Sequence, residues 1–121
     1  MKFWLIVGAF FSALAVLLGA FGAHGLKSKV TPESLSIFEI GVRYQMYHSL
    51  ALILIGFIGY HFPHNAIIHS AYFMLGGIMI FSGSLYLLAL LNIKWLGAIT
   101  PIGGMCFIIG WLLLAFNIYR S

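Results

Sequence analysis

The sequence predicts an all-α fold, an integral membrane four-helix bundle with a short amphipathic helical stretch before the second span. Of the 121 residues, 63% are hydrophobic and only 7% are charged. Soluble domains average about 45–50% apolar and about 25% charged residues, so too few charges remain here to cover a water-facing surface. The long apolar runs do not alternate every second residue, as the strands of a membrane barrel do. Because backbone groups in lipid must be satisfied within their own segment, each run is expected to be a helix.

The first apolar segment covers about residues 3–23. Its uncharged part, residues 3–21, is 19 residues long, and a bilayer core needs about 20 residues per crossing. Lys2 and the small residues near Ala20 resemble a secretory signal, but the apolar region of such a signal is shorter, about 7–15 residues. We therefore expect a retained first helix.

A helix start follows the short polar stretch after this segment. Thr31 is a typical N-cap, Pro32 suits the first helical position, and Glu33 places an acid in the first turn. Phe38 and Val42 then recur at helical spacing between polar residues. This pattern predicts either an amphipathic turn or two at the headgroup level or an extended end of the second helix.

The next 50 residues, 44–93, contain no Lys, Arg, Asp or Glu. This length suits two crossings, and the turn sequence at residues 61–65, which contains Pro63, divides it. The second span is therefore expected at about 43–60 and the third at about 66–91. The fourth is expected at about 95–119, with Thr100 and Pro101 as a further N-cap and first-position pair.

The six Lys and Arg residues lie at the ends of these spans and form no patch, so no nucleic-acid partner is expected. Lys2 and Arg120 lie at the terminal side, and Lys27, Lys29, Lys94 and, by its place at the start of the second span, Arg43 lie at the opposite side. Counting positive charges favours termini outside the cytoplasm.

Small residues recur at or near heptad spacing, which lets helix backbones approach closely in lipid. The first segment carries the stripe Gly8, Ser12, Ala15, Gly19 and Gly22. Pairs seven residues apart are Gly76 with Gly83, Gly77 with Ser84, Gly97 with Gly104, and Gly103 with Gly110. These stripes predict packing within one chain, or an interface with a second copy or another membrane complex.

Four strings carry a resemblance to a known family: GAFGAHGL at residues 19–26, YQMYH at 44–48, FSGSLY at 81–86 and LGAITPIGG at 96–104. Over nearly its whole length the chain resembles the YgdD/YwdK family of small bacterial inner-membrane proteins, which carries a "domain of unknown function" label and has mitochondrial relatives. The resemblance implies a multi-pass four-helix protein of the cell inner (plasma) membrane. It implies no reaction.

Eight polar side chains form a candidate cluster near the first loop: His24, Glu39, Arg43, Tyr47, His48, Ser82, Ser84 and Thr100. Glu39 precedes Arg43 by four residues, the favoured orientation of a helical ion pair. If the helices are antiparallel, His24 and the start of the second helix should converge near one membrane face. The simpler alternatives are that Arg43 extends to the headgroups, and that the other groups form hydrogen bonds that only hold the bundle together.

The sequence offers little for catalysis or for a cofactor. It contains no Asp, no nucleophile elbow and no phosphate loop. Cys106 has no cysteine partner and is expected to be buried. His61, His64 and His69 are close in the sequence, but Pro63 interrupts the helix that would place them on one face as metal ligands. We therefore expect no metal and no cofactor. A non-catalytic helix-packing accessory or scaffold protein is predicted; the alternative is a small membrane binder or conduit for a proton, cation, lipid or cofactor that uses the polar cluster.

Overall fold

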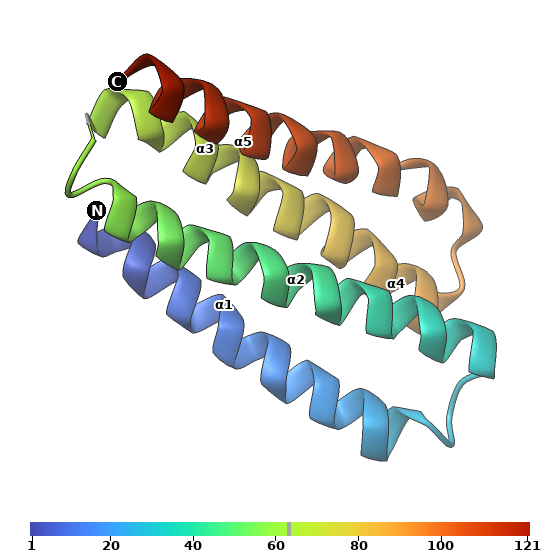
Figure 1. The fold of residues 1–121 in the computed structure, drawn as a ribbon. Coiled ribbons are helices and arrows are strands. Elements are labelled where there is room, and N and C mark those ends of the chain that lie inside the picture. The colour runs from blue at the N-terminus through green and yellow to red at the C-terminus, as the bar shows by residue number, and fades with distance from the viewer. Residues whose placement is uncertain (63) are drawn as a thin grey trace.

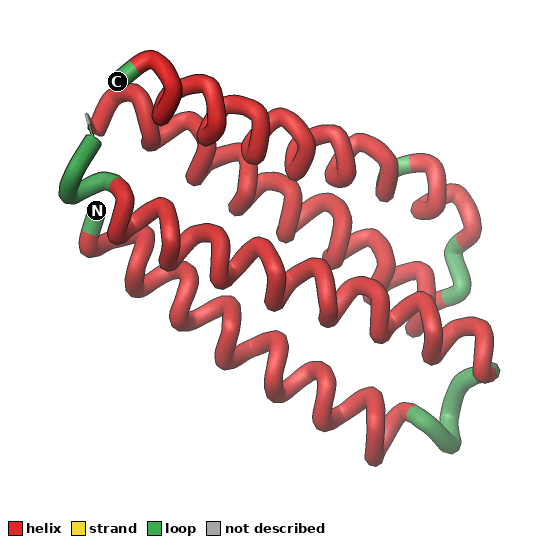
Figure 2. Tube along the Cα trace, viewed as in Figure 1, coloured by secondary structure: helices red, strands yellow, loops and turns green. Residues whose placement is uncertain are grey.

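The computed structural model describes residues 1–62 and 64–121, and this part of the chain folds into four antiparallel helical rods without a strand (Figures 1 and 2). The rods, in chain order, are α1 (Lys2–Phe21) with the π-helical turn η1 (Gly22–Leu26); α2 (Pro32–Ile58); α3 (His64–Gly77) with the π-helical η2 (Ile78–Ser82) and α4 (Gly83–Leu91); and the 3-10 turn η3 (Lys94–Ala98) with α5 (Thr100–Arg120). Both termini lie at the end where α2 connects to α3 (Figure 1).

The second helix lies in the middle of the fold. α2 packs against α1 on one side and against α3, η2 and α4 on the other, whereas α5 packs mainly on α3 and η2. The main core cluster lies between these rods and includes Trp4, Leu52, Met74 and Phe107. A smaller cluster of Leu26, Phe38 and Ala89 closes the end that carries the α1–α2 connection.

The predicted start of the second helix is confirmed. The Thr31 Oγ1 accepts a hydrogen bond from the Ser34 N–H at 3.1 Å, and Pro32 occupies the first turn of α2. The helix then continues without a break to Ile58. The amphipathic stretch is therefore the extended beginning of α2 and not a separate element.

The second predicted N-cap is wrong. Thr100 is the first residue of α5, Ile99 is its N-cap, and no side chain caps this helix end. The preceding turn η3 already leads the backbone into helical geometry, so the Thr100 hydroxyl is free to bond to Ser84 across the fold.

The predicted turn at residues 61–65 overlaps the start of α3, which begins at His64. Pro63 and the side chain of His64 lie outside the described residues.

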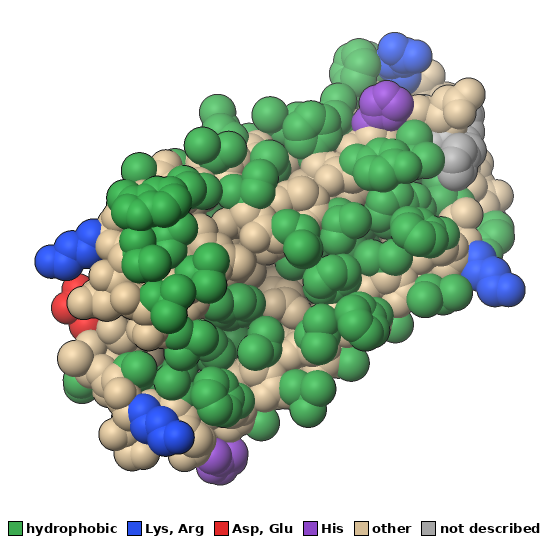
Figure 3. Space-filling view, turned by 180° about the vertical axis from the view of Figure 1, so that it is seen from behind, with side chains coloured by type: hydrophobic (Ala, Val, Ile, Leu, Met, Phe, Trp, Pro, Cys, Tyr) green, Lys and Arg blue, Asp and Glu red, His purple; other side chains and the backbone are tan. Residues whose placement is uncertain are grey.

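Among the described residues, three helical rods are long and apolar enough to cross a membrane, not the four expected: Lys2–Leu26, Ile67–Leu91 and Lys94–Arg120. α2 is equally long, but Arg43, Gln45 and His48 lower the hydropathy of its inner part. Figure 3 shows Lys and Arg side chains at the two ends of the elongated molecule, with hydrophobic side chains covering the surface between them. This distribution matches a protein surrounded by lipid along its middle.

Candidate functional site

A buried glutamine joins three of the four rods. Gln45 is 3% exposed, and its Nε2 donates to the backbone oxygen of Phe11 in α1 at 2.8 Å. The hydroxyl of Tyr86 in α4 donates to the Gln45 Oε1 at 2.6 Å. Both ends of the amide are thus satisfied inside an apolar fold, where an unpaired polar group would be costly.

His48 connects α2 to the last helix. The Trp111 Nε1 lies 3.1 Å from the His48 Nε2, and the His48 Nδ1 lies 2.8 Å from the Tyr44 backbone oxygen. An indole N–H can only donate, so Nε2 accepts and Nδ1 carries the proton that is donated to Tyr44. The imidazole also stacks on the Phe107 ring, with 3.5 Å between centroids and an angle of 11° between planes. Both ring nitrogens are therefore engaged, which leaves no lone pair on His48 for a metal or haem.

The three predicted hydroxyl groups all bond between rods. The Ser82 Oγ donates to the Gly41 backbone oxygen in α2 at 2.7 Å. The Ser84 Oγ and the Thr100 Oγ1 lie 2.6 Å apart and join α4 to α5. Ser82 ends the π-helical turn η2, and such turns are rare and frequently occur at functional sites.

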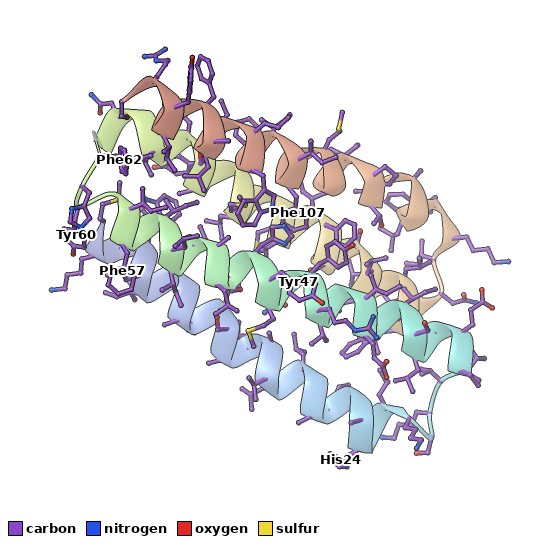
Figure 4. The ribbon with its side chains drawn as sticks, viewed as in Figure 1. His24, Tyr47, Phe57, Tyr60, Phe62 and Phe107 are labelled. Carbon is purple, nitrogen blue, oxygen red and sulfur yellow. The ribbon has the colours of Figure 1, made fainter. Side chains whose placement is uncertain are left out.

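The remaining predicted site residues do not join this interior network. Glu39 and Arg43 form the expected ion pair, with 3.6 Å between the Glu39 Oε2 and the Arg43 Nη2, but both side chains are exposed. Tyr47 is 55% exposed, although Gln45 and His48 close to it in α2 are buried. His24 is exposed at the far end of the first rod, well away from Tyr47 (Figure 4). The eight predicted residues thus divide into an interior group and a surface group.

The first stripe of small residues packs within the chain. A Cβ added at Gly8 would lie 2.7 Å from the Ser49 backbone oxygen, and one added at Gly22 would lie 3.1 Å from the Phe38 ring. Between them Ala15 is 1% exposed, and Gly19 faces Val42 at 3.4 Å. The stripe therefore serves the close approach of α1 to α2. Its Ser12 hydroxyl is buried without a hydrogen-bond partner among the described residues.

The other glycine pairs do not behave alike. Gly103 and Gly110 lie against η2 and α3, and Gly77 lies against Phe107. By contrast, in the part of the chain that the structure describes, a Cβ added at Gly76, Gly83 or Gly97 would meet no packing neighbour within 4 Å, and Gly104 has only an ordinary contact with Phe81 at 3.8 Å. The expectation that Gly76, Gly83 and Gly97 pack against neighbours is therefore not met within the chain.

Cys106, which was expected to be buried, is only half-buried.

Removing the hydroxyl of Tyr86 should destabilise the protein. In Tyr86→Phe the Gln45 Oε1 loses its donor in the interior, and interhelical hydrogen bonds in membrane proteins contribute about 0.6 kcal/mol on average and about 1.7 at most. We expect a loss of about 0.5–2 kcal/mol in the free energy of unfolding, measured by titration with a denaturing detergent and followed by circular dichroism.

Tyr47→Phe is the matched control, because it removes a hydroxyl from an exposed tyrosine of the same region. It should leave the stability unchanged. The double variant with Gln45→Leu should lose less than the sum of the two single losses, since the two groups bond to each other. Strict additivity would contradict a direct contact between Gln45 and Tyr86.

Comparison with known proteins places these features in a family context. Residues 18–104 match the family described as "Protein of unknown function (DUF423)". A UPF0382 membrane protein of Staphylococcus aureus (strain bovine RF122 / ET3-1) is 48% identical over 120 residues, covering 99% of this chain and 98% of its own. The UPF0382 membrane protein YwdK of Bacillus subtilis (strain 168) is 44% identical over 115 residues, covering 94% of each chain. The comparison with solved structures finds no match.

Proposed function

The chain belongs to the DUF423 family of membrane proteins, whose function is unknown, and we propose a function from its geometry. The protein is a non-catalytic helix-packing scaffold of the cell inner (plasma) membrane. It pairs with a second copy of itself. The family membership confirms the resemblance to YwdK-type proteins. The proposal has three parts: α2 is a fourth span, the interior polar groups hold the bundle together, and one outer face binds the second copy.

The position of α2 supports a fourth crossing. Its 27 residues correspond to about 40 Å at 1.5 Å per residue, enough for a bilayer. Gln45 and His48, the polar groups of its inner part, are satisfied by hydrogen bonds to other rods. This pairing removes most of the penalty that polar groups carry in lipid. Arg43 and Glu39 lie nearer the loop end, where headgroups and water are within reach.

The hydrogen-bond network supports a structural role for the interior. Gln45, His48, Ser82, Ser84 and Thr100 are each bonded to a group on another rod. A catalytic group or a conduit needs polar atoms that are open to a substrate or an ion, and these atoms are occupied. The bonds instead fix how the rods are rotated against one another.

The observation that supports the proposed self-association is an outer face of the α3–η2–α4 rod that carries two glycines without a packing neighbour among the described residues. Large exposed side chains lie before, between and after these glycines. In chain order the face consists of Tyr72, Gly76, Met79, Gly83, Leu87 and Leu90. Glycine within a helix costs about 0.5–1 kcal/mol relative to alanine, and no neighbour among the described residues explains the glycine at these two positions. In a pair related by a two-fold axis, this face meets its own copy, and the gaps at glycine admit the large side chains opposite.

The mass of the protein in a mild detergent tests the proposal. We expect a dimer, and we expect Gly83→Leu to raise its dissociation constant by roughly tenfold or more, because a leucine fills the gap that the partner needs. Gly97→Leu is the control, since it makes the same change at an open glycine off this face. A monomeric wild-type protein would contradict the pairing. Equal dissociation by Gly97→Leu would place the interface elsewhere.

A further inference from the structure

A cleft of about 870 Å³ opens at the loop end of the molecule. One wall comes from the connection before α2 and its first turns, including Lys29 and Glu33. The other comes from the end of α4, the loop after it and Lys94, the first residue of η3. These two segments are more than fifty positions apart in the sequence. The span Ile67–Leu91 ends beside the cleft, which places the cleft at the boundary between lipid and water.

Two ammonium groups from different segments give the cleft a positive charge. Lys29 and Lys94 line it from the two walls, and neither forms an ion pair within residues 1–62 and 64–121. Glu33 is the single acidic residue of the lining, so the net charge is positive. The first turn of α2 adds little, because Thr31 already accepts from the N–H groups of Ser34 and Leu35. Attraction for an anion therefore comes from the lysines.

The floor of the cleft is apolar. Ile37 and Leu88 line it together with Ala89, which belongs to the small core cluster at this end. A free phosphate ion would gain nothing from such a floor. A molecule with an anionic head and a hydrocarbon chain would be bound at both ends, the head by the lysines and the chain by the floor.

We propose that this cleft binds an anionic glycerophospholipid, with the phosphate between Lys29 and Lys94 and the start of an acyl chain against Ile37 and Leu88. The excess of basic residues at this end favours the leaflet where anionic lipids attract lysine. Of the residues of the self-association face, Leu90 also lines the cleft, but neither Lys29 nor Lys94 belongs to that face. Loss of lipid binding on removal of the lysines is therefore distinguishable from loss of the proposed pairing.

Lipid retention by the full-length protein in a non-ionic detergent tests the site. Native mass spectrometry should detect phosphatidylglycerol bound in preference to phosphatidylcholine with the same acyl chains. The double variant Lys29→Gln with Lys94→Gln should bind phosphatidylglycerol roughly tenfold or more weakly. Lys27→Gln removes one positive charge from the loop that carries Lys29. Lys27 does not line the cleft, so this variant should bind as the wild type does.

The outcomes separate the sources of the phosphate. Equal binding of the two lipids by the wild-type protein would overturn the proposal without any variant. An equal loss in Lys27→Gln would show general surface attraction and would also overturn it. Displacement of the lipid by millimolar inorganic phosphate would indicate a site for the free ion, contrary to the role of the apolar floor. Circular dichroism of each variant establishes that the fold is retained.

Discussion

Replacing Gly103 by alanine should lower the free energy of unfolding by about 2–3 kcal/mol, although it adds only one methyl group. A Cβ at this position would lie 2.7 Å from the Phe81 Cα and would also meet the Phe81 backbone nitrogen. Phe81 belongs to η2, so these backbone atoms cannot rotate away as a side chain could. To admit the methyl group, α5 must move away from η2, which disturbs the packing around Phe107.

The neighbouring glycine provides the control. A Cβ at Gly104 would lie 3.8 Å from the Phe81 ring, an ordinary contact distance. Gly104→Ala should therefore be neutral or slightly stabilising, because alanine favours helices over glycine by about 1 kcal/mol. Titration with a denaturing detergent, followed by circular dichroism, compares the two variants directly. Equal stability of the two would contradict the close approach of α5 to η2.

Most helices of this fold could be predicted from the sequence, because their signals are local. Lipid requires long uncharged runs, and the hydroxyl of Thr31 with Pro32 after it fixes where α2 begins. The same local chemistry misled at Thr100, whose hydroxyl is used between helices instead of at a helix end. A side chain with two available partners cannot be assigned from its neighbours in the sequence alone.

The rotation of each helix about its own axis could not be predicted. Gly76 with Gly83 and Gly77 with Ser84 have the same seven-residue spacing, yet the first pair faces outward and the second faces α5. The π-helical turn at Ile78–Ser82 lies within both intervals and changes the phase of the rod. Since neither spacing nor composition marks such a turn, the sequence left both faces open as packing surfaces.

The candidate site was predicted in part for the same reason. His48 stood out because an ionisable group in an apolar run needs a partner, and it has one in Trp111. Gln45 lies in the same YQMYH string but is not among the predicted site residues, because an uncharged amide carries no charge whose burial would single it out. Trp111 lies within an apolar run, where an indole looks like any other large apolar side chain, so the sequence does not mark it as a hydrogen-bond donor. The expected convergence of His24 and Tyr47 is not observed, because helix rotation, which only the structure supplies, leaves both side chains exposed.

Replacing Phe107 by alanine is expected to have the largest effect, a loss of about 3–5 kcal/mol in the free energy of unfolding. The side chain is 4% exposed and forms part of the main core cluster. Its ring stacks on His48, lies 5.5 Å from the ring of Phe81, and covers Gly77. Alanine would leave a cavity between α2, α3 and α5, and the His48 imidazole would lose the surface that holds it toward Trp111.

Phe116→Ala in the same helix is the matched control, because Phe116 is 52% exposed and its loss opens no cavity. Its effect on the free energy of unfolding should stay below about 1 kcal/mol.

A substitution at Gly77 tests whether the lost stability comes from the contact of Phe107 with Gly77 or from the smaller side-chain volume alone. Gly77→Val alone should destabilise the protein, since a Cβ there meets the Phe107 ring, but in the Phe107→Ala background it should recover part of the lost stability by filling the cavity. Recovery requires that the two residues share one space, so additive losses would contradict the packing of α5 on α3 described above.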